Sequence, residues 1–202
     1  MESKKAQRRW YKFLYAIAMP FFRGFYPTKY IGKENIPEGG ALICGNHCAA
    51  NDPIFIIFGL GWNRQIHPMA KESLMKIPVI GWILKSVGTF GVKRGAADLH
   101  ALKFALDELK NGQYVLVFPE GTRVKSREEG EPKTGAALMA TRTGAPVLPV
   151  YVPLKKRPFR LNRIYFGEPF YMKPAGKRAT MEELETFTED LMDRIYSCGD
   201  GK

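Results

Sequence analysis

Two residues that can handle a proton, His47 and Asp52, stand five positions apart just after the apolar run Ala41–Cys44. A neutral imidazole can take a proton from an alcohol as its oxygen attacks, and a carboxylate on the other ring nitrogen fixes the tautomer and orientation of the ring. The His-x4-Asp spacing therefore makes His47 a candidate general base and Asp52 its orienting partner. Two plainer explanations compete: Asp52 only caps a helix, or His47 only bonds a backbone carbonyl.

A second polar segment, Glu120–Arg123, follows the apolar run Tyr114–Phe118. The guanidinium of Arg123 offers a planar fork of donors suited to phosphate, and Gly121 lets backbone N–H groups come close to an anion. Glu120 can orient that arginine or accept a hydrogen bond from a substrate hydroxyl. A solvated loop without a function is the alternative for the whole segment.

Further basic residues supply positive charge that a phosphate site near His47 would need. They are Lys71, Lys93, Arg94 and Lys133. If the loops that carry them converge with Arg123 on the side of His47, they form a phosphate cradle beside a general base. Taken singly, each of these lysines is equally well explained as a solubilising surface residue.

The cysteines raise the question of a metal. Cys44, His47 and Cys48 are spaced closely enough to suggest zinc. A structural zinc site needs four ligands, however, and neither His67 nor His100 belongs to a second Cys/His cluster. We therefore predict no metal and no cofactor, and we interpret Cys48 as a small buried hydrophobe. The odd number of cysteines favours a reducing compartment.

The elements that must hold these residues alternate between strands and helices. The sequence predicts strands at 30–36, 41–44, 66–70, 89–92, 114–118, 147–152 and 163–166, and helices at 52–60, 78–86, 97–110, 135–142 and 181–196. This alternation predicts a single α/β domain with a mostly parallel central sheet flanked by helices. Such sheets keep their sites at the ends of strands, which is where His47 stands.

Composition narrows the class of protein. With 202 residues, 45% of them hydrophobic and 25% charged, the chain fits one globular domain and not a multi-span membrane protein. The formal net charge of +11 predicts an anionic partner, either nucleic acid, a membrane surface or a phosphorylated small molecule. The basic run Lys155–Arg160 suits nucleic acid or lipid headgroups. Because the chain has no nucleotide-binding motif and no nucleic-acid module, we expect no nucleic-acid partner.

The first 27 residues combine positive charge with aromatic side chains. Trp10 and Tyr11 precede a ten-residue apolar run, Phe13–Phe22, and basic residues crowd the twelve positions at the start of the chain: Lys4, Lys5, Arg8, Arg9 and Lys12. The run is half the length of about 20 residues that a spanning helix needs. It also lacks a small-x-small cleavage site, which argues against a signal peptide.

Aromatic residues beside lysines and arginines are typical of a helix that lies in a membrane interface and meets anionic lipid. We therefore predict an amphipathic membrane-interface helix within residues 1–27 and an α/β domain over residues 28–202. A first helix packed on the core with a solvated basic tip is the alternative. Pro20 is expected to kink or end this helix near Met19.

Together these segments resemble the lysophosphatidate (1-acylglycerol-3-phosphate) acyltransferase family, from about Ile31 to Val152. Four motifs stand in the family's order: Asn46–Asp52, Gly88–Arg94, Phe118–Arg123 and Val147–Val150. The resemblance implies a glycerol-3-phosphate acyltransferase-like α/β fold. Where the family often has small hydroxyl residues after the histidine, this chain has Cys48-Ala49-Ala50.

The resemblance also implies a reaction. A fatty acyl group would pass from an acyl carrier protein or coenzyme A thioester to the sn-2 hydroxyl of 1-acyl-glycerol-3-phosphate, giving phosphatidate without a metal. His47 and Asp52 would be catalytic. Substrate would be bound by Lys71, Arg94 and Arg123 at the phosphate, by Glu120 at the acceptor and by Pro149 at the acyl chain. Gly121 and Thr122 would also bind substrate.

Such an enzyme of phospholipid biosynthesis has lysophosphatidate, the thioester donor and a lipid surface as partners. We expect it to be peripheral or monotopic on the cytoplasmic face of the cell membrane. Two alternatives stay open. One is an acyltransferase that acts on another lysophospholipid or glycerolipid acceptor, and the other is a non-catalytic protein that binds anionic lipid.

Overall fold

Seven strands form the central sheet of the computed structural model, which describes residues 2–93 and 98–199. Their order across the sheet is β1-β7-β6-β2-β5-β3-β4. The bounds are Thr28–Ile31 for β1, Leu42–Gly45 for β2, Ile66–Lys71 for β3, Phe90–Val92 for β4, Tyr114–Val117 for β5, Val147–Tyr151 for β6 and Asn162–Phe166 for β7. Every neighbouring pair is parallel except β6 and β7. The predicted α/β domain with a mostly parallel sheet is confirmed.

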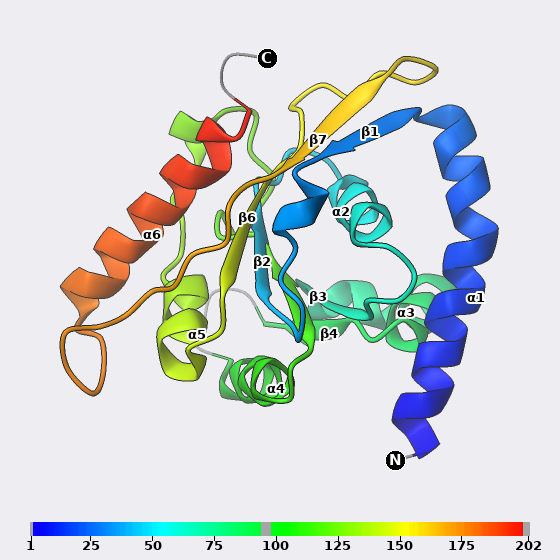
Figure 1. Ribbon diagram of the computed structural model, residues 1–202. Coiled ribbons are helices and arrows are strands. Elements are labelled where there is room, and N and C mark those ends of the chain that lie inside the picture. Colours follow the sequence, from blue (N-terminus) through cyan, green and yellow to red (C-terminus); the bar gives the residue numbers. More distant parts are fainter. Residues whose placement is uncertain (1, 94–97, 200–202) are drawn as a thin grey trace.

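Helices cover both faces of this sheet (Figure 1). They are α1 Glu2–Phe25, α2 Asp52–Leu60, α3 Pro78–Ser86, α4 Leu99–Lys110, α5 Gly135–Thr143 and α6 Met181–Ser197, with short 3-10 helices at Lys33–Asn35, Glu72–Lys76 and Arg127–Glu129. Helices α4, α5 and α6 pack on one face, α2 packs on the other, and α1 lies against α2 and α3.

The central strands are apolar along their whole length because both of their faces are covered. Successive residues of a strand point to opposite faces, so Leu42 and Cys44 join the core under α4, α5 and α6, while Ile43 joins the core under α2. Strand β5 divides in the same way, with Val115 on the first side and Leu116 on the second. Burial on two faces makes β2 and β5 a rigid support for the loops that follow them.

Three of these parallel strands end side by side. Strand β2 lies between β5 and β6 and runs parallel to both. The carboxyl ends of parallel strands meet at one edge of a sheet, so the loop after β2, the loop after β5 and the segment after β6 leave the sheet together. They carry His47, Glu120 and Lys156 respectively.

Of the two outcomes expected at Pro20, a kink or an end of the helix near Met19, the structure excludes the end. Helix α1 runs through Pro20 to Phe25. Proline removes one helical donor and crowds the preceding turn, which disfavours a helix interior. The residues beyond it are held by packing, because the Phe22 ring lies 4.7 Å from that of Phe55 and 5.1 Å from that of Phe58. Tertiary contacts with α2 therefore outweigh the local preference.

Candidate active site

The centre of the site is a histidine–aspartate pair. Nδ1 of His47 lies 2.9 Å from Oδ2 of Asp52, and the side chain of Asp52 is 0% exposed while that of His47 is 14% exposed. An ionised carboxylate only accepts hydrogen bonds, so in the neutral ring Nδ1 carries the proton and Nε2 has the lone pair. The His47 ring also stacks on Phe118, with centroids 4.2 Å apart. The ring is therefore held in orientation with its basic nitrogen available.

The backbone around Asp52 folds so that the carboxylate can serve as a hub. Helix α2 begins at Asp52, with Asn51 at its N-cap. Oδ2 of Asp52 accepts hydrogen bonds from the main-chain N–H groups of Cys48, at 2.6 Å, and Ala49, at 2.7 Å. Asp52 thus turns the loop after β2 back on itself and brings His47 to it. The alternative that Asp52 only caps a helix is wrong, because the N-cap is Asn51 and the Asp52 side chain bonds the loop before the helix and His47.

Asn46 fixes the point where the chain leaves the sheet. Its side-chain Nδ2 donates to the carbonyl of Val152 at 2.8 Å, and its Oδ1 accepts from the N–H of Val152 at 2.7 Å. Asn46 is fully buried. These two hydrogen bonds between the Asn46 amide and the main chain of Val152 tie the loop that carries His47 to the end of β6.

Glu120 holds the main chain of His47. Its Oε2 accepts from the N–H of His47 at 2.6 Å, its Oε1 accepts from the hydroxyl of Tyr196 at 2.7 Å, and the residue is 2% exposed. Burial raises the pKa of the Glu120 carboxyl, although the hydrogen bonds from Tyr196 and His47 act in the opposite direction. Both carboxylate oxygens have protein donors, and a direct contact between Glu120 and substrate stays a prediction.

The rest of the Glu120–Arg123 segment turns toward solvent. Gly121 has φ of +64°, in the left-handed region that favours glycine, so the tight turn there depends on the residue type. Thr122 and Arg123 are exposed. The turn therefore separates the buried carboxylate of Glu120 from the exposed guanidinium of Arg123, three positions later.

The other predicted site residues differ in how exposed they are. Lys71 is exposed at the end of β3, and Pro149 is buried within β6. Neither Lys71 nor Arg123 makes an ion pair in the part of the chain that the structure describes, so both charges are available to an anion. Arg94 lies outside the described residues. The structure thus joins His47, Asp52 and Glu120 by direct bonds, while the roles of the other residues stay predictions.

Sequence reasoning missed Lys156 and Tyr196. Lys156 belongs to the basic run Lys155–Arg160, yet its side chain is only 5% exposed and forms an ion pair with Asp52. Nothing in the sequence distinguishes it from its exposed neighbours. The sequence does contain a signal for Tyr196, because it continues the apolar pattern of Leu191 and Ile195 in α6, and this pattern predicts a buried side chain. Within residues 2–93 and 98–199, no three His, Cys, Asp or Glu side chains are grouped to hold a metal ion.

A family model and several named proteins are similar in sequence to this chain. A family model described as Acyltransferase matches residues 27–153. A 1-acyl-sn-glycerol-3-phosphate acyltransferase of Bacillus subtilis is 32% identical over 174 residues, which cover 83% of this chain and 86% of that protein. A chloroplastic protein of Brassica napus with the same activity in its name, BAT2, is 35% identical over 62% of this chain, and the match spans 37% of the plant protein.

The chain also resembles a solved structure. The crystal structure of the 1-acyl-sn-glycerophosphate (LPA) acyltransferase PlsC from Thermotoga maritima matches 98% of this chain and 83% of that one, with a TM-score of 0.68 and 26% identity. The residues matched by the family model include His47, Asp52 and Glu120. The model covers well over half of the chain and the Bacillus subtilis relative matches most of it, so the chain belongs to the Acyltransferase family.

Proposed function

We propose that this protein is a 1-acylglycerol-3-phosphate O-acyltransferase, which transfers a fatty acyl group to the sn-2 hydroxyl of lysophosphatidate and releases phosphatidate. The observation that carries the proposal is the buried Asp52 bonded to Nδ1 of the partly exposed His47. The names of the relatives from Bacillus subtilis, Brassica napus and Thermotoga maritima support the choice of acceptor.

The chemistry follows from the orientation of the His47 ring. Nε2 takes the proton of the sn-2 hydroxyl while the oxygen attacks the thioester carbonyl. The carbon–oxygen bond forms, the carbon–sulfur bond breaks, and the imidazolium returns the proton to the departing thiolate. Asp52 stabilises the imidazolium in between. An acyl carrier protein or a coenzyme A thioester serves as the donor, and no covalent acyl-enzyme is needed.

Exposed cations on the neighbouring loops provide the phosphate site in this proposal. Arg123 and Lys71 are exposed and make no ion pair with described residues, and a guanidinium can bind phosphate through two parallel hydrogen bonds. Arg94 would add a third charge, with Gly121 and Thr122 lining the acceptor and Pro149 shaping the acyl site. This set distinguishes lysophosphatidate from acceptors without a terminal phosphate.

The test is an assay of the purified protein with lysophosphatidate, lysophosphatidylcholine and monoacylglycerol, each with both thioester donors. We expect lysophosphatidate to be preferred. Arg123→Ala should raise the KM for lysophosphatidate about tenfold or more, because a charge-assisted bond to phosphate is lost, and should leave the KM for monoacylglycerol unchanged. A preference for another acceptor, or an unchanged KM for lysophosphatidate, would reject the assignment of substrate. Absence of transfer to any acceptor would favour a non-catalytic lipid-binding protein.

We also propose a membrane-facing surface formed by α1 and α3, called here the apolar surface. The two helices meet where the rings of Trp10 and Trp82 lie 5.5 Å apart and where Gln7 donates to the carbonyl of Lys85. Its exposed apolar residues are Trp10, Phe13, Ile17, Phe21 and Phe25 of α1 and Val79, Ile80, Trp82 and Ile83 of α3. Apolar side chains of this size are rarely left together in water without a partner.

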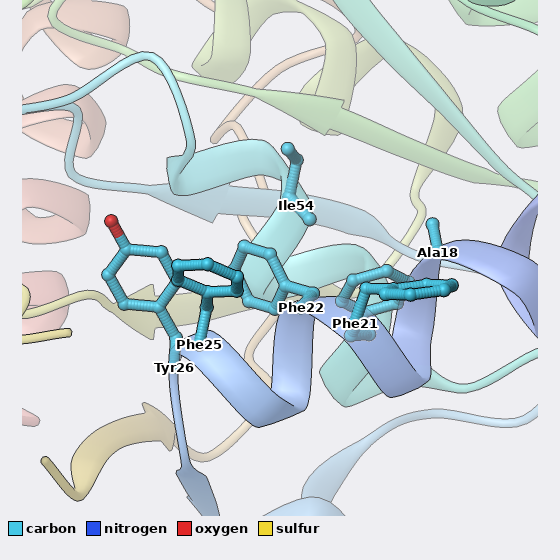
Figure 2. Close-up of a pocket in the computed structure, with 7 residues that line it drawn as sticks. Ala18, Phe21, Phe22, Phe25, Tyr26 and Ile54 are labelled. Carbon is cyan, nitrogen blue, oxygen red and sulfur yellow. The ribbon is translucent and has the colours of Figure 1, made fainter. Parts of the chain in front are cut away.

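The end of α1 extends the apolar surface to α2. Figure 2 shows Phe21, Phe22 and Phe25 of α1 gathered with Tyr26, which follows the helix, and with Ile54 of α2, where they line a shallow apolar groove. Exposed basic residues accompany the surface, namely Lys5, Arg8, Arg9 and Arg23. Among the described helices, none is long and apolar enough to cross a membrane. We propose attachment to the cytoplasmic face of the cell membrane through this surface, with its cations on anionic headgroups.

A further inference from the structure

A lysine reaches the catalytic pair from a distant part of the chain. Lys156 follows β6, and its Nζ forms an ion pair with Oδ1 of Asp52 and donates to Sγ of Cys48 at 2.7 Å. Its side chain is 5% exposed, whereas its neighbours Lys155 and Arg157 are exposed. A lysine is rarely buried unless its charge is paired, so this placement ties Lys156 to Asp52 specifically.

The two oxygens of Asp52 have different partners. Oδ2 accepts from His47 Nδ1 and from the main chain of Cys48 and Ala49, while Oδ1 faces Lys156. Burial raises the pKa of Asp52, but the hydrogen bond from His47 and the charge of Lys156 more than offset it, and the pKa lies below its ordinary value. The carboxylate is therefore ionised and held from both sides.

Cys48 completes this arrangement as a neutral group. Burial raises the pKa of its thiol, with Lys156 acting in the opposite direction, and the net shift is upward. A neutral sulfur can accept a weak hydrogen bond from an ammonium group without cancelling its charge. The positive charge of Lys156 is thus directed at Asp52. This gives a use to a residue that the sequence explained only as a small hydrophobe.

The segment that carries Lys156 is fastened to the body of the protein. Buried Asn162 accepts from the N–H of Arg157 at 2.9 Å and donates to the carbonyls of Arg157 and Arg160. The N–H of Phe159 bonds the carbonyl of Phe25 at the end of α1. These bonds already fix the main chain around Lys156, so less conformational entropy is lost when its side chain binds Asp52 than on a free loop.

We propose that Lys156 is a positioning residue of the transfer reaction, which fixes Oδ1 of Asp52 and offsets the negative charge that the carboxylate presents to His47. The proposal rests on the proposed function for its role in turnover. An uncompensated buried carboxylate would favour the imidazolium, which cannot act as a base, and a positive charge on the far oxygen weakens that effect. Removal of Lys156 should therefore strengthen the attraction of Asp52 for the proton of His47.

The other titratable groups around the pair do not replace this charge. Glu120, from the loop after β5, bonds the main chain of His47, and Tyr196 of α6 contacts Glu120. Cys48, from the loop after β2, lies 3.8 Å from Oδ1 of Asp52. Among the described residues, Lys156 is the cation that forms an ion pair with Asp52.

The experiment is the pH profile of kcat/KM for the wild type and for Lys156→Met, Lys156→Arg and the exposed neighbour variant Lys155→Met. The acid limb of the Lys156→Met profile should move to higher pH by about one unit or more, because loss of a nearby positive charge favours the protonated form of His47 by about that amount. Lys156→Arg should keep the limb within a few tenths of the wild-type position, and Lys155→Met should keep the wild-type profile. An unshifted limb in Lys156→Met would overturn the proposal, since a purely structural lysine lowers the rate at all pH values alike.

A second measurement does not depend on turnover. It keeps the proposal testable if the Lys156→Met protein folds poorly. The Cε1 proton of His47 is titrated by NMR in the wild type and in Lys156→Gln, with circular dichroism as the check on folding. We expect the midpoint to rise by about one pH unit. An unchanged midpoint in a folded variant rejects the role of Lys156. A raised midpoint in a protein that transfers no acyl group would reject the proposed function and leave the electrostatic role of Lys156 standing.

Discussion

At the residue scale, the site depends on the hydrogen bonds that Asp52 accepts from His47 and from the loop before α2. His47 and Asp52 are close in sequence, and the N–H groups of Cys48 and Ala49 turn the loop so that they meet. Asp52 lies at the first turn of α2, where the helix dipole stabilises a negative charge. The carboxylate therefore stays ionised and keeps the imidazole in one tautomer.

Asp52→Asn should reduce kcat about 10³-fold while leaving the fold in place. The amide has nearly the same shape, but its NH2 group must face either His47 and two main-chain donors or Lys156, and its negative charge is lost. The measurement is kcat at saturating substrate together with the thermal midpoint. Turnover within a few-fold of the wild type would show that the carboxylate has no part in the reaction.

The sequence was sufficient for this pair and insufficient for Lys156. Five positions separate His47 from Asp52, so local turn geometry decides whether they meet. Lys156 reaches Asp52 from the segment after β6, and that contact exists only because β6 lies next to β2. A contact of this kind depends on the order of strands in the sheet, and the residues around Lys156 do not predict that order.

At the element scale, strong periodicity and turn residues located most helices and strands correctly. The helix predicted at 78–86 is α3, and the one predicted at 52–60 is α2. Two errors came from tertiary packing and backbone geometry. Helix α1 continues past Pro20 because Phe22 packs on α2, and β1 stops at Ile31 because Gly32 adopts φ of +75° and starts a 3-10 turn.

Tyr196→Phe should destabilise the protein in a pH-dependent way. The hydroxyl of Tyr196 satisfies a buried oxygen of Glu120, so its loss leaves an unpaired acceptor, at a cost of about 1–3 kcal/mol. Burial already raises the pKa of Glu120, and that residue's contribution to stability is present below its unfolded pKa and lost as pH rises through the folded value. Without the hydroxyl the folded pKa rises further.

The free energy of unfolding in urea should therefore differ little between variant and wild type at about pH 4, where Glu120 is protonated in both, and differ most at about pH 8. Tyr171→Phe, at an exposed tyrosine, is the control and should have no effect at either pH. A difference of equal size at both pH values would mean that packing of the ring, and not the bond to Glu120, accounts for the loss.

At the scale of the whole molecule, charge and apolar surface are distributed unevenly. Helix α1 carries exposed arginines and aromatic residues on one side, and α6 lies on the opposite side of the sheet (Figure 1). Helix α6 is rich in acidic residues, namely Glu182, Glu183, Glu185, Glu189, Asp190 and Asp193. An anionic lipid surface attracts the first side and repels the second. This distribution supports the proposal that α1 and α3 face the membrane.

Substitution on the apolar surface should weaken binding to vesicles of phosphatidylglycerol and phosphatidylcholine. Phe21→Glu and Val79→Glu, at residues 73% and 69% exposed, should each reduce partitioning about tenfold or more, because a large side chain no longer enters the apolar layer. Leu99→Glu is the matched control, since Leu99 is 73% exposed but belongs to α4 on the other face of the sheet. Equal losses in all three variants would contradict a surface specific to α1 and α3.

The central claim is that the imidazole of His47 removes the proton from the acceptor hydroxyl. The most direct measurement is the rate of phosphatidate formation by purified wild type and His47→Ala at saturating lysophosphatidate and thioester. The account predicts a loss of about 10²- to 10⁴-fold, with the thermal midpoint and vesicle binding close to those of the wild type. A His47→Ala protein that forms phosphatidate at a rate within a few-fold of the wild type would contradict it.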